Sequence, residues 1–355
     1  MPTTAIFSQY KIVRLTAPIF YTNEFELRAF AAHSLRLTVV DAEDPDTLIP
    51  LVADADIVAL IGTRLPARVI EALTRCRAIA RMGAGTDKID VARATELGIV
   101  VANTPYFCVE EQADHAMALL LSLARKLTVA QRAMAEGDLV RARSAVSSNQ
   151  RVSTSTLGLV GFGRSAVHMA RRARGFGMRV LATRNNKRAP TDEADAIGVT
   201  MADLDTILRE SDYVSLHLPL NATTYHMIDG AALQKMKPTA VLINTSRGAL
   251  VDEPALVDAL QHGRLAGAGI DTFESIDVFT DQIPPRLHAL SDMENVILTP
   301  HVAAGSVQAG EDIYTTAIEN IVDILSGRWP PRENIVNPTV VPRFPLAARE
   351  QAIGG

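Results

Sequence analysis

The sequence predicts an α/β protein built from two parallel-sheet domains with a cleft between them. The first observation is that short apolar runs of strand character alternate with helical patterns along almost the whole chain. This alternation is typical of βαβ units, in which helices cover both faces of a parallel sheet. The second is the length of 355 residues, which suggests two domains of ordinary size. The third is a single long helical pattern, at residues 110–136, that divides the strands into two series.

The first series of strands occupies the N-terminal third of the chain. Helical segments such as 66–76 fill the gaps between these strands. The long helix predicted at 110–136 has a broad apolar face, and the polar, patternless segment 139–156 after it predicts a loop. The expected strands are 11–16, 35–40, 56–62, 78–83 and 99–105.

The second series of strands follows this loop. A last helix is expected at about 306–326, and the proline-rich tail after it is expected to be extended, packed or partly disordered. The long helix at 110–136 is the natural crossover to a second domain, and the last helix would return the chain to the first. Both sheets therefore fit the Rossmann or flavodoxin-like class. The expected strands are 157–163, 179–184, 212–219, 240–246, 265–273 and 295–301.

Composition excludes several classes of function. The net charge of −5 does not favour nucleic acid or an anionic membrane surface. The two cysteines, Cys76 and Cys108, make no metal-binding spacing, so no metal is expected, and free thiols fit a reducing compartment. The N-terminus lacks the apolar stretch of a signal peptide, and no apolar run is long enough to span a bilayer. A soluble, cytoplasmic protein is expected.

The stretch TLGLVGFGRSAVHMARRARGFGMRVLATR carries a dinucleotide-binding pattern. Gly161, Gly163 and Ala166 form G-x-G-x-x-[GA] after an apolar strand and at the start of a helix, which is the context that makes this pattern specific. The first glycine allows the tight turn, the second lets pyrophosphate approach the backbone, and the third position needs only a small residue. The helix N-terminus then offers N–H groups to phosphate.

The end of the next strand favours NADP over NAD. An NAD site usually has an acid there to bind the ribose 2′-OH, but this strand ends in VLATRNNKR. Arg184 stands where the acid would be, with Asn185, Lys187 and Arg188 behind it. A guanidinium binds a 2′-phosphate well, whereas a carboxylate would repel it. The alternative is that Arg184 is a solvated surface residue and the site binds NAD without its acid.

Candidate catalytic groups follow other strands. Arg247 comes directly after a buried strand, where it could clamp a carboxylate and polarise the adjacent carbonyl. His301 ends the last strand and could move a proton to or from a hydroxyl during hydride transfer. Taken alone, His217 and His115 look like hydrogen-bonded core histidines. The backbone N–H groups of a nest at Gly83, Ala84 and Gly85 could bind a substrate carboxylate.

Together these residues resemble the D-isomer-specific 2-hydroxyacid dehydrogenase family from about residue 50 to residue 330. The segment YFCVEEQADHAMALLLSLARKL is most similar to the branch with the C-terminal-binding proteins, corepressors with a dehydrogenase fold, and phosphoglycerate dehydrogenases. The motifs that carry the resemblance are RMGAGTDKIDVARATELGIVVANTP, LGLVGFGR, SLHLPLNATT, LINTSRGALVDEPAL, AGAGIDTFE and ILTPHVAAGS.

The resemblance implies a substrate domain formed by residues 1–108 and 302–355 and a cofactor domain formed by 109–301. It implies that Arg247 binds the 2-oxo acid, that His301 is the general acid in reduction, and that the nest holds the substrate carboxylate. It implies a homodimer built through the cofactor domain. It places the following residues in the cofactor site: Gly161, Gly163, Arg164, Ser165, Thr183, Arg184, Asn185, His217, Pro219, Thr245 and Asp271.

The sequence departs from the family at the third catalytic group. The family pattern Asp-x-x-x-x-Glu-Pro starts at Asp271, so the glutamate that pairs with the histidine would fall at Ile276, which offers no hydrogen bond. Asp277 is the first candidate replacement and Glu274 the second; the third alternative is that no carboxylate pairs with His301. A paired carboxylate would raise the pKa of His301 and fix its tautomer.

The favoured function is therefore NADP(H)-dependent reduction of a small 2-oxo acid to a D-2-hydroxy acid. The missing glutamate motivates an alternative, a cofactor-sensing, corepressor-like binding protein with weak activity. Dehydrogenation of formate or a phosphite-like anion is a further alternative, because Arg247 would bind such anions too. Arg64, Tyr106 and Phe107 are equally consistent with the cleft and with ordinary surface or core, and segment 278–294 is a candidate for shaping specificity.

Overall fold

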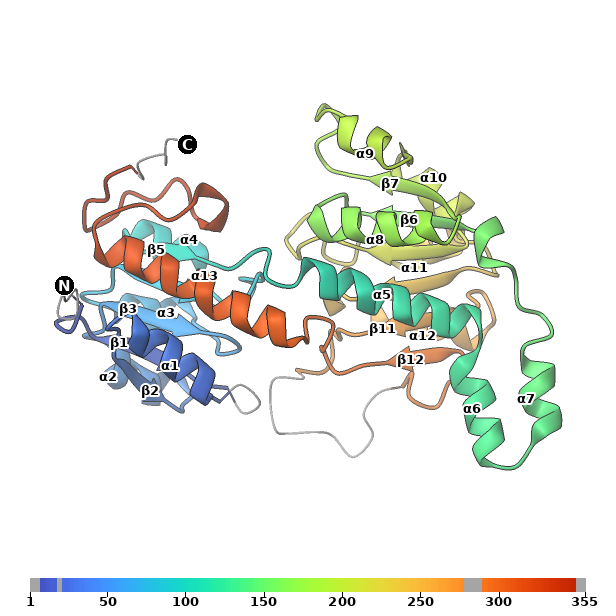
Figure 1. Ribbon diagram of the computed structural model, residues 1–355, viewed down its shortest axis with the longest axis horizontal. Helices are drawn as coiled ribbons and strands as arrows, with labels where there is room; N and C mark the ends of the chain where they lie inside the picture. The colour runs from blue at the N-terminus through green and yellow to red at the C-terminus, as the bar shows by residue number, and fades with distance from the viewer. Residues whose placement is uncertain (1–6, 18–20, 278–288, 349–355) are drawn as a thin grey trace. The chain divides into compact units, whose positions relative to one another are not determined.

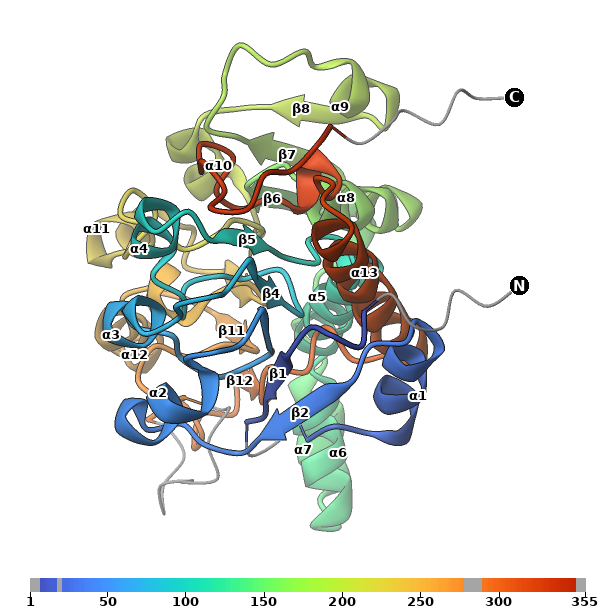
Figure 2. The same ribbon diagram turned by 90° about the vertical axis from the view of Figure 1, so that its left-hand side faces the viewer.

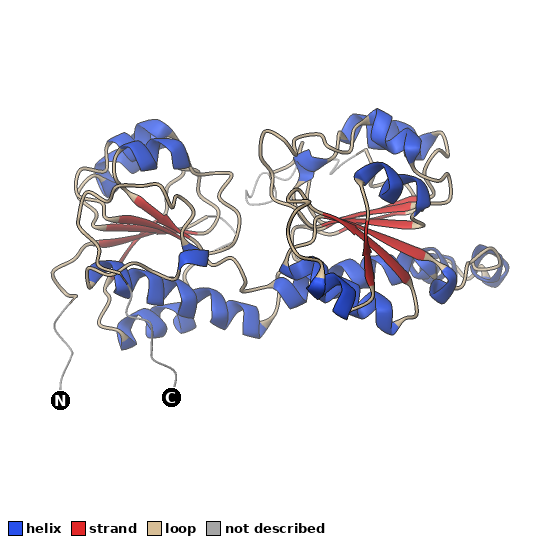
Figure 3. Ribbon diagram, turned by 90° about the horizontal axis from the view of Figure 1, so that it is seen from above, coloured by secondary structure: helices blue, strands red, loops and turns tan. Residues whose placement is uncertain are grey.

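The computed structural model describes residues 7–17, 21–277 and 289–348. The described chain forms two compact units (Figure 1). Unit 1 contains the residues up to Phe107 and those from Ser306 onward, and unit 2 contains most of the chain between them. Each unit holds a fully parallel sheet with helices on both faces (Figure 3). The predicted fold class, α/β with two parallel-sheet domains, is confirmed.

Unit 1 has a five-stranded sheet in the order β2-β1-β3-β4-β5, which is the flavodoxin-like order. Its strands are rich in Ile, Val, Leu and Ala, and all except the edge strand β2 are almost entirely buried, as expected for a sheet covered on both faces. They are β1 (Ile12–Leu15), β2 (Leu37–Val40), β3 (Ile57–Leu60), β4 (Ala78–Arg81) and β5 (Val100–Ala102).

Two layers of helices enclose this sheet (Figure 2). α1 (Glu24–Ala32) and α13 (Val307–Leu325) pack on one face, where Phe30, Ile318 and Ile321 are buried against the strands. The opposite face is covered by three helices, and Leu48, Val69 and Ala94 lie in its core. These three helices are α2 (Pro45–Val52), α3 (Ala67–Glu71) and α4 (Val91–Glu96).

Unit 2 has a seven-stranded sheet in the order β12-β11-β10-β9-β6-β7-β8. Counted from its first strand, this is the Rossmann order with one further strand at the edge. The order reverses between β6 and β9, so the carboxyl ends of these strands form the position where open sheets bind ligands. The strands are β6 (Thr156–Val160), β7 (Arg179–Thr183), β8 (Val199–Met201), β9 (Tyr213–Leu216), β10 (Val241–Asn244), β11 (Gly267–Ile270) and β12 (Val296–Leu298).

The helices of unit 2 also lie on both faces of their sheet. α5 (Val109–Ala124), α8 (Arg164–Gly175) and α9 (Asp192–Ala196) share one core with the strands, and three further helices share the other. The other three are α10 (Leu204–Glu210), α11 (Gly230–Lys235) and α12 (Glu253–Gln261). Single 3₁₀ turns occur at Val152–Thr154, Gly248–Leu250 and Arg332–Asn334.

Two sequence expectations about elements were wrong, and one strand was missed. The long helix expected at 110–136 is two helices, because Lys126 adopts a left-handed φ of 50° that ends α5 and begins α6 (Leu127–Ala135). The expected loop 139–156 contains α7 (Leu139–Ala145), whose first turn is capped by the Asp138 carboxylate accepting from the Arg141 N–H. The short edge strand β8 was not expected at all.

The C-terminal tail, as far as it is described, packs against unit 1. The Asn337 carboxamide accepts from the Val101 N–H and donates to the Ile99 carbonyl, which satisfies the free edge of β5. The Arg343 guanidinium donates to the carbonyls of Leu73, Thr74 and Leu97. Of the three expectations for this tail, the structure shows packing. None of the described helices is long and apolar enough to cross a membrane.

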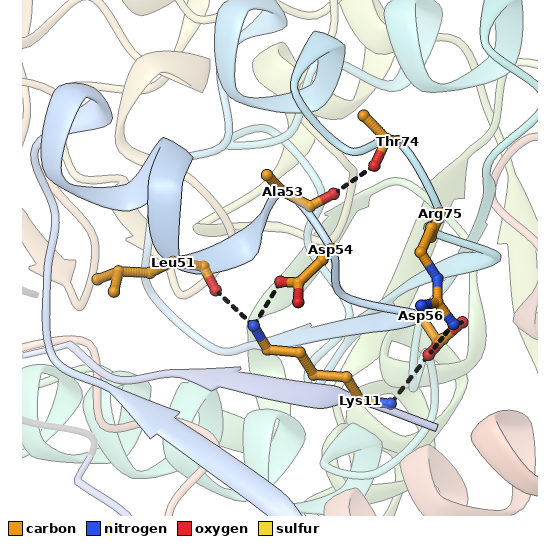
Figure 4. A network of polar contacts seen from close by, with 7 residues as sticks. All are labelled: Lys11, Leu51, Ala53, Asp54, Asp56, Thr74 and Arg75. Atoms are coloured by element: carbon orange, nitrogen blue, oxygen red, sulfur yellow. Dashed lines mark hydrogen bonds and ion pairs between the residues drawn. The ribbon is translucent and has the colours of Figure 1, made fainter. Parts of the chain in front are cut away.

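A polar network joins the amino ends of the strands in unit 1 (Figure 4). The Asp56 carboxylate accepts from the Lys11 backbone N–H at 2.9 Å and pairs with the Arg75 guanidinium at 3.3 Å. The Lys11 ammonium pairs with Asp54 and donates to the Leu51 carbonyl. The hydrogen bond from Lys11 holds the pKa of Asp54 below its usual value. The network therefore ties β1, β3 and the end of α2 together at the edge of the sheet.

Candidate functional site

The dinucleotide motif forms the turn between β6 and α8. Gly161 has φ of 98°, and a Cβ there would lie 2.2 Å from the His217 carbonyl oxygen, so this position requires glycine. Gly163 is the N-cap of α8, and nothing lies within 4 Å of where its Cβ would be. Arg164 and Ser165 begin the helix. The turn thus leaves open space in front of a twelve-residue helix, which fits the pyrophosphate of a dinucleotide.

His217 connects this turn to the sheet. Its ring nitrogens lie 3.1 Å from the Ser165 hydroxyl and 3.0 Å from the Ser215 hydroxyl. Burial lowers the pKa of His217 to about 4, so the ring is neutral at physiological pH. A hydrogen-bonded core histidine was one of its two expected roles, and the structure joins that role to the cofactor loop. Pro219, two residues on, is exposed and its carbonyl accepts from the Thr224 hydroxyl.

A hollow of about 250 Å³ lies at the carboxyl end of β7, where a Rossmann sheet binds the adenosine ribose. The Arg184 Nη2 donates to the carbonyls of Ala189 and Pro190, and its Nε and Nη1 have no recorded partner in the described parts of the chain. Asn185 follows and is exposed. The residues that line the hollow are Thr183, Arg184, Lys187, Thr191, Met201, Ala202 and Asp203.

Arg247 directly follows the buried strand β10. Its backbone is fixed by the Asn244 side chain, which donates to the Arg247 carbonyl at 2.8 Å and accepts from the Ser246 N–H. The Thr245 hydroxyl is buried and has no hydrogen-bond partner among the described residues. An unpartnered buried hydroxyl at the carboxyl edge of the sheet fits a site whose remaining partner is the bound cofactor.

Asp271 and His301 meet after the neighbouring strands β11 and β12. The Asp271 side chain is completely buried, and its carboxylate accepts from the Val302 and Ala303 N–H groups, both at 3.0 Å. The His301 N–H donates to the Asp271 carbonyl at 2.8 Å, and His301 adopts a left-handed φ of 56°. β10, β11 and β12 are adjacent, so the structure brings Arg247, Asp271 and His301 to one edge of one sheet.

Glu274 is engaged with a different histidine. Its carboxylate accepts from the His226 ring at 2.8 Å and from the Tyr225 hydroxyl at 3.0 Å, and these two rings stack at 3.9 Å. Ile276 is half-buried and Asp277 is exposed. Residues 278–288 of the segment expected to shape specificity lie outside the described residues. Whether Asp277 or Glu274 serves His301 stays a prediction.

The expected anion nest lies at the end of β4 in unit 1. The Gly83 N–H donates to the Thr104 hydroxyl at 2.7 Å, and Gly83 has φ of 134°. The Ala84 and Gly85 N–H groups have no recorded acceptor within the described chain. The Arg81 guanidinium donates to the Gly85 carbonyl and adds positive charge beside the loop. Two of the three expected N–H donors are therefore available to an anion.

The sequence left open whether three further residues of unit 1, Arg64, Tyr106 and Phe107, belong to the substrate site or to ordinary surface or core. These residues differ in their exposure. Arg64 and Tyr106 are exposed, whereas Phe107 is only partly buried and packs on the core beneath α13.

Sequence reasoning missed several residues of this site. Tyr225 and His226 bind Glu274. Gln112 and His115, on α5, reach the ends of β10 and β12. The residues of each contact are far apart in sequence, so no local pattern marks them. The signal that could have found the α5 pair is its spacing, since residues three apart share one helix face.

Comparison with known families and proteins agrees with this geometry. The profile described as "D-isomer specific 2-hydroxyacid dehydrogenase, NAD binding domain" matches residues 117–303. A glyoxylate reductase from Korarchaeum cryptofilum is 42% identical over 296 residues, which cover 83% of this chain and 86% of that protein.

Solved structures with this fold include enzymes bound to either cofactor. An NADPH-dependent glyoxylate/hydroxypyruvate reductase from Sinorhizobium meliloti, in complex with NADP and malonate, is 31% identical with a TM-score of 0.78, covering 92% of this chain and 98% of that one. A D-lactate dehydrogenase from Aquifex aeolicus, complexed with NAD and lactic acid, is 26% identical with a TM-score of 0.83, covering 92% of this chain and 99% of that one.

Proposed function

Since this chain belongs to the D-isomer specific 2-hydroxyacid dehydrogenase family, we propose that it uses NADPH to reduce glyoxylate or a 2-oxo acid of similar size. The chain is an NAD(P)-dependent 2-hydroxyacid dehydrogenase; the substrate, the cofactor preference and the residue roles are the proposal. One observation carries it: Arg247 and His301 lie at the carboxyl edge of the sheet that also bears the dinucleotide turn.

The chemistry needs one cation and one acid. The Arg247 guanidinium binds the 2-oxo acid and polarises its carbonyl, which makes the carbonyl carbon more electrophilic. The bound dinucleotide supplies the hydride for that carbon. His301 donates its ring proton to the carbonyl oxygen, so the product is a neutral hydroxyl and the ring is left neutral. We propose that the Ala84 and Gly85 N–H groups bind the substrate carboxylate.

The direct test is incubation of the purified protein with NADPH and a panel containing glyoxylate, hydroxypyruvate, pyruvate and bulkier 2-oxo acids. Turnover of the small members, with the D-configuration where the product is chiral, is the expected result. Binding of NADPH without turnover of any member would contradict the proposal. Oxidation of formate or phosphite with NADP, run in parallel, tests the remaining chemistry that Arg247 could support.

The preference for NADPH rests on the hollow at the end of β7. Arg184 and Lys187 line it, and Arg184 keeps donors for a phosphate. Asp203 also lines it, and the hydrogen bond from the Thr206 N–H holds the pKa of Asp203 below its usual value, so this carboxylate is charged. Two cations against one anion leave a net positive charge, which favours the 2′-phosphate.

The dissociation constants for NADPH and NADH test this preference. NADPH binds more tightly to the wild type, and Arg184→Gln and Lys187→Gln each weaken NADPH roughly tenfold while leaving NADH unchanged, because only the 2′-phosphate contact is lost. Arg188→Gln is the matched control, since Arg188 is in the same loop but does not line the hollow. Tighter binding of NADH by the wild type would overturn the preference.

We also propose that the protein is a homodimer formed through unit 2. α6 and α7 expose Leu127, Met134, Leu139 and Val140, and Val140 is 80% exposed. A group of large apolar side chains on a helical pair marks an association surface. Light scattering after gel filtration gives a dimer for the wild type and a monomer for Leu127→Asp/Val140→Asp. A monomeric wild type at micromolar concentration would refute this part.

A further inference from the structure

One face of α5 contacts both strand ends that bear the proposed catalytic residues. The Gln112 Nε2 donates to the Thr245 carbonyl at 2.9 Å, two residues before Arg247. The His115 Nε2 lies 2.9 Å from the Thr299 hydroxyl, two residues before His301. Residues three apart in a helix are neighbours on its surface, so a single turn of α5 reaches the ends of β10 and β12.

The direction of the hydrogen bonds at Thr299 follows from proton counting. A threonine hydroxyl has one proton, and Thr299 gives it to the Asp271 carboxylate at 2.6 Å, a length typical of a charge-assisted bond. Thr299 must therefore accept from His115, whose Nε2 carries a proton. The same Nε2 lies 3.6 Å from the Asp271 carboxylate, and His115 is the one ionisable side chain recorded within 4 Å of it in the described chain.

Asp271 in turn fixes the backbone around His301. Its side chain and carbonyl together accept from three consecutive N–H groups, those of His301, Val302 and Ala303. His301 is the first of these three residues and has φ of 56°, a conformation that a residue other than glycine keeps only when its surroundings hold it. The chain His115, Thr299, Asp271 therefore ends on the backbone of His301.

We propose that Gln112 and His115 are positioning residues, Gln112 for Arg247 and His115 for His301. The inference deepens the proposed function and rests on it. It adds α5 to the groups that orient His301, because the His115–Thr299–Asp271 contacts act on the backbone of His301. Neither side chain touches the substrate; each acts through the strand end that it holds.

Steady-state kinetics separates positioning from general stability. His115→Leu removes the donor and lowers kcat ten- to a hundredfold, in the range seen when partners that orient catalytic ligands are removed, with an unchanged KM for the 2-oxo acid. His115→Gln keeps an N–H donor and restores most of kcat. Gln112→Met raises the KM for the 2-oxo acid, because Arg247 binds its carboxylate. His262→Leu on α12 and Asp114→Asn on α5 are the controls and leave both parameters unchanged.

Combination with a second substitution tests whether His115 acts through His301. In a His301→Asn background, His115→Leu causes no further loss of rate, because its target is absent. Equal fold losses in both backgrounds, or a kcat of His115→Leu within twofold of the wild type, overturn the inference. A wild type that turns over no 2-oxo acid refutes the proposed function instead.

An NMR measurement tests whether His115 positions His301, and it does not depend on enzyme turnover. The ring signals of His301 are assigned by their loss in His301→Asn. His115→Leu shifts these signals and His262→Leu does not, because only His115 is connected to the His301 backbone. His301 signals that stay in place in His115→Leu overturn the inference whether or not the enzyme is active.

Discussion

The carboxyl edge of the sheet in unit 2 and the amino edge of the sheet in unit 1 hold their polar side chains in opposite ways. At the amino edge, the buried Asp56 carboxylate meets the exposed Arg75 guanidinium and the Lys11 ammonium meets the exposed Asp54, so each charge has an opposite charge as its partner. At the carboxyl edge, the Asp271 carboxylate is completely buried, and it contacts neutral hydrogen-bond donors and one histidine. The Thr245 hydroxyl there has no partner among the described residues.

This difference indicates that the polar groups of one edge serve stability and those of the other serve function. These matched charges are complete within the protein and need no ligand, and the exposed pair of Lys11 with Asp54 contributes little free energy. Buried polar groups that lack a hydrogen-bond partner, and residues with a strained backbone, cost free energy in the protein alone. They gather at sites where a bound ligand supplies the missing contacts. We therefore expect substitutions at the carboxyl edge to change catalysis, and substitutions at the amino edge to change stability alone.

His301→Asn is the substitution with the largest expected effect. Asparagine tolerates a left-handed φ, so the hydrogen bonds between Asp271 and the backbone of residues 301–303 stay intact. Only the ring that moves the proton is lost. We expect kcat to fall about 10²- to 10⁴-fold, the contribution of a positioned general acid, with little change in melting temperature. A loss below fivefold would mean that His301 is not the acid.

His217 gives a stability effect at the carboxyl edge that depends on pH. The pKa of the buried ring is about 4, whereas an unfolded histidine has a pKa near 6.5. As the pH falls from 6.5 to 4, the unfolded chain binds a proton that the folded ring does not, so the free energy of unfolding decreases, by roughly 3 kcal/mol from this group. Above pH 6.5 the contribution is constant.

Urea unfolding at several pH values measures this effect. His217→Asn removes the titrating ring, so the wild type loses more stability than the variant between pH 6.5 and 4. A His262→Asn control keeps the wild-type slope, because His262 is exposed and its ring side chain is 66% accessible. Equal slopes in the wild type and His217→Asn would show that the ring is not buried in its neutral form.

His301 and His217 also show which features of the candidate site could be predicted from the sequence. His301 and Arg247 were predicted because their placement depends on topology alone: each directly follows a strand, and the ends of parallel strands share one edge. A hydrogen-bonded role was predicted for His217, but its partner Ser165 was not, because Ser165 comes from a different element of the chain. Contacts of this kind depend on how helices pack on the sheet, which hydrophobic periodicity does not specify.

The fold was predictable for the same reason. The apolar runs placed the longer strands, whereas β8 is a three-residue edge strand whose sequence, Val-Thr-Met, is too short to show a pattern. The break between α5 and α6 falls at Lys126, with no glycine or proline to mark it. The pairing of Glu274 with His226, 48 residues away, follows only from the tertiary structure.

Asp56→Ala tests the opposite edge and should cost stability without cost to catalysis. The substitution leaves the part-buried Lys11 N–H without its acceptor and removes the partner of Arg75. We expect a loss of about 1–3 kcal/mol in the free energy of unfolding, the range for an unsatisfied buried donor, with kcat and KM unchanged. Asp54→Ala is the control, since its carboxylate is exposed. A changed kcat in Asp56→Ala would break the division between the edges.

The smallest expected effect separates the remaining alternatives for the partner of His301. Both Glu274 oxygens already accept hydrogen bonds from His226 and Tyr225, and Asp277 is exposed, where water weakens its interaction with any imidazole. If the α5 residues orient His301, Asp277→Asn changes kcat less than twofold and leaves the pH dependence of kcat/KM in place. A loss above tenfold, with the basic limb of that profile moved to lower pH, would instead identify Asp277 as the carboxylate that raises the pKa of His301. The pH dependence of kcat/KM is also measured for Glu274→Gln. This substitution breaks the contacts with His226 and Tyr225 and alters the loop after Phe273, but it removes no charge beside His301. The profile therefore distinguishes Glu274 from Asp277.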